Sequence, residues 1–554
     1  MSSSRRKFVK RILSLSLLYK NGTLNALENK IIVNDENSDP IAVNKKISVH
    51  DYIYPEHFGA VGDGLNDDTN AIDSALKYAF NNGRKSVLLS SLYCISDTVN
   101  IPSYISVIGV GEGSGFILKR DNQKKIVMVK FSGEYSIIRN FSILFGCNTI
   151  GNIGDIQVYG VLMTDTSQNC AVNEIKINAK YSGRIGFTHG ARITGRNNVI
   201  NNSHILNGSM CISVRGEGHN ISSNYLSNNF FSEGIRPWSK DSPQWDGVVM
   251  EGCSKCSIIG NIVEGCGQSG IYCGGNGSLS FDNTIKNNIV FNNWNRGIDI
   301  GVTGESSDKN GVFGMLIESN HSHDNREPQI WLDGVVQSRV INNFVEISSD
   351  YEKKFSGFYG GRVGISLGQK NNSLRNEIID NTIVLNQDDT AAITIIGTDS
   401  IIKSNRMVGK SYWVKDPSVI LANTVDNYKT KLNLNIINDY HYKVLKCDGV
   451  LSINDSDYLF NVSVVVKKES KSESDSFIIG IFPGLKGKKV KVIQLQVDLD
   501  KTLASELTII SKFDEDSRGI IISMVTKDKS GTVDMSSLDH LSYNLHIHGF
   551  FKVQ

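Results

Sequence analysis

The chain has 554 residues, of which 40% are hydrophobic and 21% are charged, and its formal net charge is +1 at pH 7. This composition is ample for a large core, and the presence of only eight prolines excludes a proline-rich disordered chain. The near-neutral charge provides no strongly basic surface for nucleic acid or an anionic membrane, so we expect neither as a partner.

The first 26 residues resemble a twin-arginine export signal of bacteria. Residues 4–10 read SRRKFVK, and a short apolar run follows over residues 12–19. The run is shorter than the ~20 apolar residues that cross a bilayer, so we expect no membrane span. The resemblance implies export to the periplasm or beyond, with residues 27–48 as a polar linker. The alternative is a basic N-terminus without a targeting role.

Residues 55–83 predict a tight glycine loop followed by a short helix. Asp67 or Asp68 suits the N-cap of a helix that begins near Thr69, and Gly83 suits its end. The apolar residues at helical spacing are Ala71, Ile72, Ala75, Leu76, Ala79 and Phe80. Such a helix would cover the open end of a repetitive β-structure.

Between residues 137 and 405 a frame recurs in which Asn follows Ile or Val by three positions. The asparagines are Asn140, Asn202, Asn224, Asn261, Asn288, Asn320, Asn343, Asn381 and Asn405. A tenth frame, from Val172 to Ile175, has Ile in the Asn position. A repeat of ~20–40 residues with β-branched residues indicates a solenoid of strands. We predict an all-β fold, a right-handed parallel β-helix of about ten coils. The Ile/Val column would face inward and the Asn column would lie at a turn, bonded between coils.

A second strand follows each Asn by about ten residues, and its alternating residues should face outward. The expected outward pairs in successive coils are Ser213 and Arg215, Val249 and Glu251, Tyr272 and Gly274, Asp299 and Gly301, Trp331 and Asp333, and Ser366 and Gly368. We expect insertions to fall at particular turns and to build up one side of the solenoid.

The stretch from Phe58 to Ile72, FGAVGDGLNDDTNAI, resembles the N-terminal motif of pectate-lyase-like right-handed β-helix proteins. This superfamily includes the rhamnogalacturonase/epimerase-type family, exopolygalacturonases and phage tailspikes. The resemblance implies a β-helix over residues 49–430 and polysaccharide as the partner, whereas Asp63, Asp67 and Asp68 look structural. A twin-arginine leader before this fold is also similar to the layout of a periplasmic β-helix protein of colanic-acid synthesis.

The candidate catalytic residues are Asp299, Asp333 and Glu251. Asp299 and Asp333 would lie one coil (~4.8 Å) and two strand positions (~6.6 Å) apart, which allows carboxyl separations of roughly 5–9 Å. Glycoside hydrolases use carboxyl pairs in this range, and Glu251 with Asp299 is a second option. The alternative is that these are ordinary solvated carboxylates. We expect Asp299→Asn or Asp333→Asn to abolish depolymerisation with little loss of stability.

A lyase would instead need a base and a cation that neutralises a uronate carboxylate. Arg215 or Arg236 could supply that charge, and the sequence contains no clear Asp cluster for Ca²⁺. We therefore predict no cofactor, except for Ca²⁺ if the protein is a lyase.

Aromatic and charged side chains on the outward strip and in a long insertion are candidates for polysaccharide binding. They are Arg215, Tyr272 and Trp331 on the strip, and Glu233, Arg236, Trp238 and Trp245 in the insertion over residues 230–246. The next strand of the repeat could lie at Ile235 or at Val248, which fit the expected spacing equally well. Insertions at 303–313 and 350–361 could line the same groove; the alternative is that the loop aromatics cover core.

The nine cysteines include Cys253, Cys256, Cys266 and Cys273, whose spacing invites a zinc site or a disulfide. We favour buried thiols that pack in the core, and predict no metal site. For His321 and His323 we likewise favour turn chemistry over metal ligation.

After residue ~430 the Asn frames stop and alternating apolar strands begin. They predict an antiparallel β-sandwich-like domain over residues 431–554, which could cap the solenoid, bind sugar or support a homotrimer. The function we favour is cleavage of a bacterial exopolysaccharide or O-antigen by a glycoside hydrolase or polysaccharide lyase. The alternatives are a non-catalytic protein of polysaccharide assembly or export, and a phage or prophage tailspike.

Overall fold

The computed structural model describes most of the region after residue 51 and leaves out residues 1–51. The described ranges are 52–83, 86–119, 126–145, 158–179, 188–228, 246–275, 278–302, 311–349, 363–368, 373–386, 391–395, 397, 399–409 and the strands after residue 423. The predicted export signal and linker, and the insertions 229–245, 303–310 and 350–362, lie outside the described residues.

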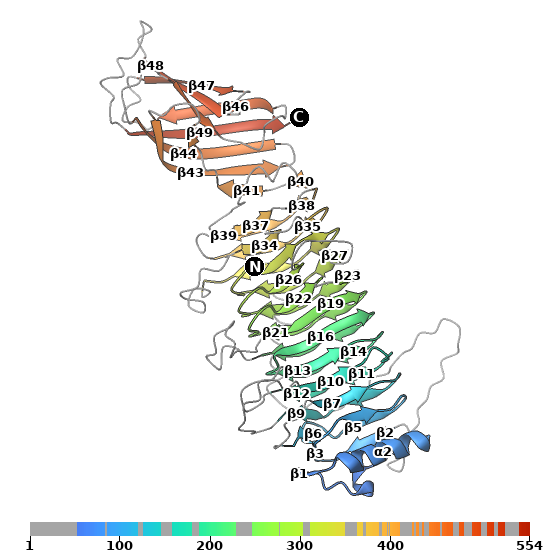
Figure 1. Ribbon diagram of the computed structural model, residues 1–554. Helices are drawn as coiled ribbons and strands as arrows, with labels where there is room; N and C mark the ends of the chain where they lie inside the picture. Colours follow the sequence, from blue (N-terminus) through green and yellow to red (C-terminus); the bar gives the residue numbers. More distant parts are fainter. Residues whose placement is uncertain are drawn as a thin grey trace, which may run out of the picture. The chain divides into compact units, whose positions relative to one another are not determined.

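The region up to residue 425 is built from three parallel sheets, and each coil contributes a strand to sheet C, then to sheet A, then to sheet B (Figure 1). Sheet A contains β2 (Ser86–Leu89), β5 (Ser106–Gly109), β8 (Ile137–Arg139), β11 (Ala171–Asn173), β14 (Val199–Asn201), β17 (Asn220–Ser222), β20 (Ser257–Ile259), β24 (Thr284–Lys286), β28 (Leu316–Glu318), β32 (Arg339–Ile341), β35 (Glu377–Ile379), β38 (Ile401–Lys403) and β40 (Thr424–Val425). Sheet B contains β1 (Asp63–Asp67), β3 (Leu92–Ile95), β6 (Gly115–Leu118), β9 (Ser142–Leu144), β12 (Lys176–Asn178), β15 (His204–Leu206), β18 (Tyr225–Ser227), β21 (Ile262–Glu264), β25 (Ile289–Phe291), β29 (His321–His323), β33 (Phe344–Ile347), β36 (Thr382–Leu385) and β39 (Arg406–Gly409). Sheet C contains β4 (Val99–Ile101), β7 (Ile126–Phe131), β10 (Val158–Met163), β13 (Thr188–Ile193), β16 (Met210–Glu217), β19 (Val248–Ser254), β22 (Ile271–Gly274), β26 (Ile298–Gly301), β30 (Ile330–Asp333), β34 (Val363–Leu367) and β37 (Ala391–Ile395), with side strands β23 (Leu279–Phe281), β27 (Gly311–Phe313) and β31 (Val335–Val336).

The predicted parallel β-helix is confirmed, with more coils than the Asn frames indicate. The ten frames correspond to the ten strands of sheet A from β8 to β38, whereas the sheet has 13 strands. The three others, β2, β5 and β40, lack the frame. The undescribed connections also cluster at the turns, mostly between a sheet-B strand and the next sheet-C strand, as expected for insertions.

A buried column of seven asparagines links the coils from Asn224 to Asn405. In each step the backbone N–H and side-chain amide of one Asn donate to Oδ1 of the next, as from Asn261 to Asn288 at 2.9 and 3.0 Å. The same Asn261 amide also donates to the Ile221 carbonyl at 3.0 Å. Every coil therefore hydrogen-bonds to both neighbours through one buried side chain.

Two of the nine predicted ladder positions are wrong by one residue. Asn140 and Asn202 have φ of 60° and 47° and occupy the left-handed position that precedes the ladder position, whereas the ladder position itself holds Phe141 and Ser203. In the later coils the residue before the ladder Asn is left-handed, for example Asn287 at 57°. Asn tolerates left-handed angles as well as ladder bonding, so the residue type alone cannot distinguish the two positions.

The inward column of sheet A is aliphatic and fully buried. Its members pair in register and are Ile138, Val172, Ile200, Ile221, Ile258, Ile285, Ile317, Val340, Ile378 and Ile402. In the first and third of these coils the predicted inward residues were Ile137 and Val199, but both are only partly buried and point outward.

The predicted cap is the short 3₁₀ turn η2 (Pro55–Phe58) followed by helix α2 (Thr69–Asn81), whose buried face contacts β2, β3 and β4. Asp68 accepts hydrogen bonds from the N–H groups of Val61 (2.7 Å) and Gly62 (3.1 Å), and Asp67 accepts from Thr69. These contacts are structural, as the resemblance implied. The prediction for Phe80 is wrong, because its side chain is 54% exposed.

The described core cysteines are buried and free, which confirms the thiol interpretation: Cys94, Cys170, Cys211, Cys253, Cys256, Cys266 and Cys273. Burial raises the pKa of Cys273 to about 12, so this thiol stays protonated.

The C-terminal strands form two antiparallel sheets, as predicted. One contains β41 (Tyr428–Lys431), β43 (Tyr442–Asn454), β44 (Asp457–Lys468), β49 (Ser542–Val553) and β46 (Val490–Leu499); the other contains β42 (Asn435–Ile436), β45 (Ser476–Gly480), β48 (Gly519–Thr526) and β47 (Leu507–Asp514).

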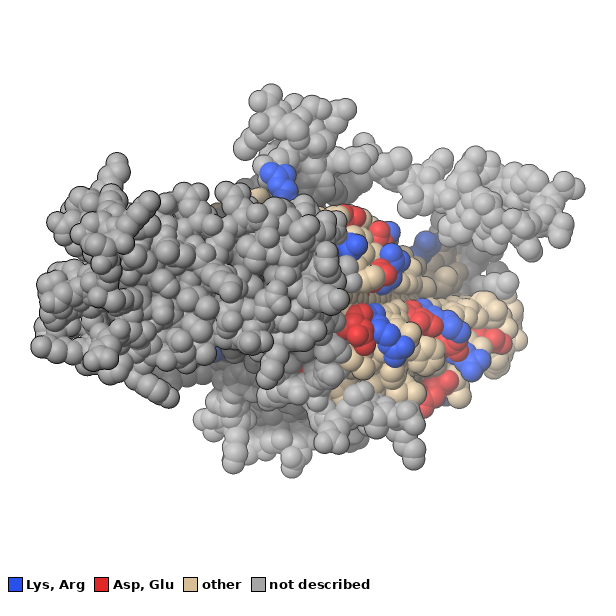
Figure 2. Space-filling model, turned by 90° about the horizontal axis from the view of Figure 1, so that it is seen from above, with Lys and Arg blue, Asp and Glu red and all other residues tan. Residues whose placement is uncertain are grey.

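Charged side chains of opposite sign lie next to one another on the visible face of the described part (Figure 2). Several pairs bridge neighbouring coils, such as Lys286 and Glu318 at 2.8 Å and Arg339 and Glu377 at 2.7 Å. Exposed pairs of this kind contribute little to stability, but they leave no large field of one sign on that face.

Candidate functional site

The outward face of sheet C has the register that the sequence predicts. Tyr272 pairs with Asp299 and Asp299 with Trp331, while Gly274 pairs with Gly301 and Gly301 with Asp333. Val248, not Ile235, begins the strand after the long insertion, and it pairs with Ile271. This register brings Glu251 and the column of Tyr272, Asp299 and Trp331 onto one face within four coils.

Asp299 lies at the centre of a buried polar cluster. Its Oδ2 accepts a hydrogen bond from the Ser269 hydroxyl (2.7 Å) and pairs with the Arg296 guanidinium (3.0 Å). The side chains of Arg296 and Asp299 are 18% and 5% exposed. The Ser269 backbone N–H donates to Oδ1 of Asp246 at 2.8 Å. One serine thus holds two carboxyl groups that come from different coils.

The two carboxyl groups have different surroundings. Asp246 is buried, and burial, together with the charges of Asp299 and Glu251, raises its pKa from 3.8 to about 8 against the opposing effects of the Ser269 N–H and Arg296. At neutral pH Asp246 is therefore protonated. Asp299 instead pairs with the Arg296 guanidinium and accepts a hydrogen bond from the Ser269 hydroxyl.

Tyr272 lies beside these carboxyl groups and depends on a glycine for its position. A Cβ added at Gly274 would lie 2.0 Å from the Tyr272 hydroxyl oxygen, so only glycine leaves room for the ring. Burial and the charges of Asp299, Glu251 and Asp246 raise the pKa of the Tyr272 phenol. Glu251 pairs with Arg215 at 2.9 Å and is 21% exposed.

Trp331 forms a wall of the cluster instead of an open platform. The Arg296 guanidinium lies 3.6 Å above its ring, and the residue is 8% exposed. Its ring also covers Gly301, where an added Cβ would lie 2.7 Å from the indole. Within the described part, Trp331 Nε1, Arg296 Nε and Asp299 Oδ1 are buried without a hydrogen-bond partner. Arg296 Nε lies 3.8 Å from Glu327.

We call Asp246, Glu251, Ser269, Tyr272, Arg296, Asp299 and Trp331 the sheet-C site. Asp333 has the predicted offset from Asp299, but it is 1% exposed, and Asp299 bonds to Ser269 and Arg296. The predicted catalytic pair of Asp299 and Asp333 stays a prediction.

Four predicted binding residues, Glu233, Arg236, Trp238 and Trp245, lie outside the described residues. Their segment joins β18 of sheet B to β19 of sheet C, next to Asp246. Sequence reasoning placed Asp246 only in the loop proposed as a groove wall and gave no role to Ser269 and Arg296. All three lie at stacked positions, three residues before the outward residues Val249, Tyr272 and Asp299.

No group of three or more His, Cys, Asp or Glu residues in the described ranges could hold a metal ion. None of the described helices combines the length and apolarity that a membrane crossing requires.

No family model matches the chain. The tail spike protein of Salmonella phage epsilon15 is 29% identical over 482 residues, which cover 82% of this chain and 44% of that protein. The capsule K30/K69-specific depolymerase of Klebsiella phage K64-1 is 23% identical over 306 residues, covering 49% and 37%. The chain thus spans less than half the length of these curated relatives.

Among solved structures, the Dettilon tailspike protein is 28% identical with a TM-score of 0.69, covering 91% of this chain and 95% of that one. The tailspike of E. coli bacteriophage HK620 has a TM-score of 0.53 at 11% identity, with coverages of 90% and 94%, and supports the fold alone. Together with the three stacked parallel sheets, these similarities show that the chain has a right-handed parallel β-helix fold like that of phage tailspike proteins.

Proposed function

We propose that the protein is a glycoside hydrolase that cleaves a bacterial surface polysaccharide at the sheet-C site. The observation that carries the proposal is the linkage of Asp246 and Asp299 through Ser269, in different surroundings: Asp246 is buried with a raised pKa, whereas Asp299 pairs with Arg296. Two carboxyl groups of which one is an acid and the other a base are the usual equipment of glycoside hydrolysis. The names of two similar proteins, a tail spike and a capsule depolymerase, support the substrate class.

In this proposal Asp246 donates its proton to the oxygen of the leaving sugar. Asp299 pairs with Arg296 and accepts a hydrogen bond from Ser269, and in this proposal it activates water or stabilises the positive charge that develops at the sugar ring. Glu251 is the second candidate for that role, since its side chain is more exposed than that of Asp299. Tyr272 contributes a hydroxyl beside both groups.

Hydrolysis is favoured over elimination because Arg296 of the sheet-C site and Arg215 beside it already have carboxylate partners. Arg215 pairs with Glu251 at 2.9 Å, and Arg296 pairs with Asp299 at 3.0 Å and lies 3.8 Å from Glu327. A lyase needs a cation for the uronate carboxylate, and a bound uronate would face three or more carboxyl groups here. The site therefore suits a neutral glycan segment, and Ca²⁺ is not part of the proposed chemistry.

A phage tailspike is the second candidate function, and it is compatible with the same chemistry. The observation in its favour is the similarity to the Dettilon tailspike protein over 91% of this chain. A homotrimer would accompany this role. We also propose that the twin-arginine signal directs export of the protein from the cytoplasm. Sequencing the N-terminus of protein recovered outside the cytoplasm tests this proposal.

The proposal is tested by incubation with purified Salmonella surface polysaccharides and with K30 and K69 capsular polysaccharides. We expect the wild-type protein to lower the molecular mass of at least one of them on gel filtration, and the Asp299→Asn variant to bind it without cleavage. A wild-type protein that binds but never shortens any of them would leave only the non-catalytic alternative.

A further inference from the structure

Sheet B has an outward face of a different character from sheet C. One column consists of Lys176, His204, Tyr225, Ile262, Ile289, His321 and Phe344, and the adjacent column contains Glu264, Phe291, His323 and Glu346. These residues alternate with the buried inward residues Ile177, Ile205, Leu226, Val263, Val290, Ser322 and Val345. The face crosses seven strands, which is roughly 29 Å at the spacing of stacked strands.

Four rings form a continuous cluster on this face. Phe291 and His323 stack with centroids 4.9 Å apart and ring planes within 4°. His321 lies 4.4 Å from His323 and 4.9 Å from Phe344. The side chains of His321 and His323 are 28% and 23% exposed, so the cluster reaches the surface. Rings that are held by one another in a flat sheet lose little entropy when a ligand stacks on them.

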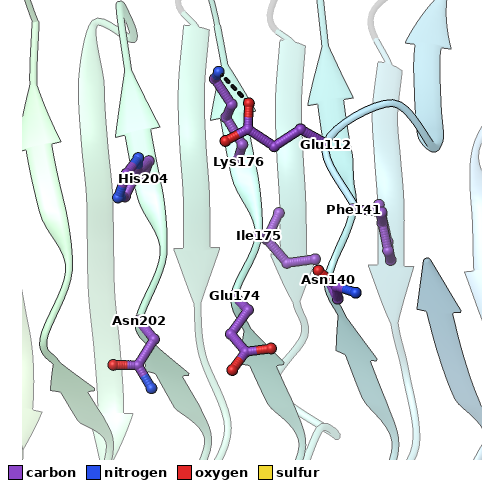
Figure 3. A pocket seen from close by; sticks show the side chains of 8 residues that line it. All are labelled: Glu112, Asn140, Phe141, Glu174, Ile175, Lys176, Asn202 and His204. Carbon is purple, nitrogen blue, oxygen red and sulfur yellow. Dashed lines mark hydrogen bonds and ion pairs between the residues drawn. The ribbon is translucent and has the colours of Figure 1, made fainter. Parts of the chain in front are cut away.

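A polar cavity of about 160 Å³ lies at the other end of the same face (Figure 3). Glu112 and Lys176 form an ion pair of 2.6 Å at one rim, His204 lies to one side, and Asn202 and Glu174 lie opposite. The volume is large enough to admit several water molecules. Carboxylate, amide and ammonium groups around it can bind hydroxyl groups.

The cavity and the ring cluster are connected by polar and aromatic contacts. His204 meets Tyr225 edge to face at 5.8 Å, and the Tyr225 hydroxyl donates to Glu264. Glu264 is in register with Phe291 of the cluster. Polar groups and rings therefore occur at both ends of the face, and Glu264 and Phe291 lie beside the aliphatic residues Ile262 and Ile289 between them.

The charge of this face narrows the choice of ligand. Its carboxyl groups are Glu264 and Glu346, the buried Asp324, and Glu174 and Glu112 at the cavity, of which Lys176 balances Glu112. Burial lowers the pKa of His321 to about 4, so this ring is neutral at pH 7. The face is therefore acidic, which opposes an anionic glycan, a nucleic acid or the same face of a second copy.

We propose that this face, the sheet-B track, is a second binding site for a neutral polysaccharide, separate from the sheet-C site. The inference rests on the proposed function for the identity of the polymer. The track cleaves nothing. It holds one stretch of a long chain while another stretch occupies the sheet-C site, which raises the local concentration of cleavable bonds.

The test compares long and short ligands in an Asp299→Asn background, which separates binding from cleavage. The probe is the polysaccharide of the panel above that the protein binds, as intact polymer and as purified short oligosaccharides. The test variant carries His323→Ala and Phe344→Ala, and the matched control carries Tyr135→Ala, which removes a ring that is 53% exposed on another part of the solenoid. Affinity electrophoresis measures binding, and thermal unfolding confirms that all variants are folded.

We expect the double substitution to weaken binding of the intact polymer about tenfold, equivalent to about 1.4 kcal/mol, and the control to leave it unchanged. In proteins that retain Asp299, the double variant should cleave short oligosaccharides at the same rate as the wild type. Unchanged polymer binding in the double variant, while Tyr272→Ala abolishes it, would overturn the sheet-B track alone. If Asp299→Asn retains full activity but the double variant loses polymer binding, the sheet-C assignment fails and the track stands. A wild-type protein that binds no polysaccharide of the panel overturns both.

Discussion

Replacement of Asp246 by Asn is the most informative perturbation of the site, because it removes a proton donor and keeps the shape. The amide oxygen can still accept the 2.8 Å hydrogen bond from Ser269 N–H. General acid catalysis contributes about 10²–10⁴-fold, so we expect the rate to fall by that factor. The wild-type rate should also fall as the pH rises through about 8, where Asp246 loses its proton. The variant should lack this alkaline limb.

The same substitution has a calculable effect on stability. The pKa of Asp246 rises from 3.8 to about 8 on folding, a difference of about four units or an upper bound of about 6 kcal/mol. Below pH ~4 both the folded and unfolded states are protonated, and the group costs nothing. Between pH ~4 and ~8 only the unfolded state releases the proton, so the wild-type protein loses stability as the pH rises. The Asp246→Asn variant has no carboxyl group at this position, so it does not show this loss of stability.

The assay is therefore a pair of pH profiles, one of the rate on the cleaved polysaccharide and one of the free energy of unfolding by urea, for wild-type and Asp246→Asn proteins. The variant should be slower at every pH below 8 and increasingly more stable than the wild-type as the pH rises from 4 to 8. A variant that keeps more than a tenth of the activity, or a stability difference that does not change with pH, would refute the assignment of Asp246 as a buried acid.

Three further substitutions test the site and the fold. Asp299→Asn should abolish cleavage. Contrary to the expectation from sequence, it should also cost about 2 kcal/mol of stability, because it breaks a buried pair with Arg296. An unchanged free energy of unfolding in urea would contradict this. Gly274→Ala should lower the cleavage rate about 100-fold by displacing Tyr272. The control Gly113→Ala, whose Cβ meets nothing within 4 Å, should leave the rate unchanged. Equal cleavage rates in the two variants would exclude a role for the position of Tyr272. Asn288→Ala removes four buried hydrogen bonds and should lower the free energy of unfolding by about 4 kcal/mol. The control substitution of the exposed Asn70 by Ala should lower it by less than about 0.5 kcal/mol. A loss below about 1 kcal/mol for Asn288→Ala in denaturant unfolding would mean that the asparagine ladder does not stabilise the coils.

The repeat made the fold predictable, because Ile258, Asn261 and their equivalents must occupy the same place in every coil. The errors arose where one residue type suits two neighbouring positions, as for Asn140 and Asn202 at the left-handed position. Phe80 fits the helical spacing, but the helix buries only a narrow stripe that ends at Ala79. Periodicity alone does not give the width of a buried stripe.

The outward pairs of sheet C were also predictable, since strand alternation and register follow from the repeat. The electrostatic cluster was not, because Asp246, Ser269 and Arg296 precede their strands: Ser269 reaches Asp299 from the previous coil and Arg296 reaches it from three residues earlier in the same coil, while Asp246 accepts from the Ser269 N–H. Such contacts depend on side-chain direction at a corner, which alternation does not specify. For the same reason the sequence could not show that Arg296 covers the ring of Trp331.

The central claim is hydrolysis of a neutral glycan at the sheet-C site. Its most direct test is to incubate the protein with the polysaccharide panel and to follow new reducing ends together with absorbance near 235 nm, which reports unsaturated uronates. Hydrolysis predicts reducing ends without a rise in absorbance, and their loss in Asp299→Asn. A rise at 235 nm, or undiminished reducing ends in that variant, would contradict it.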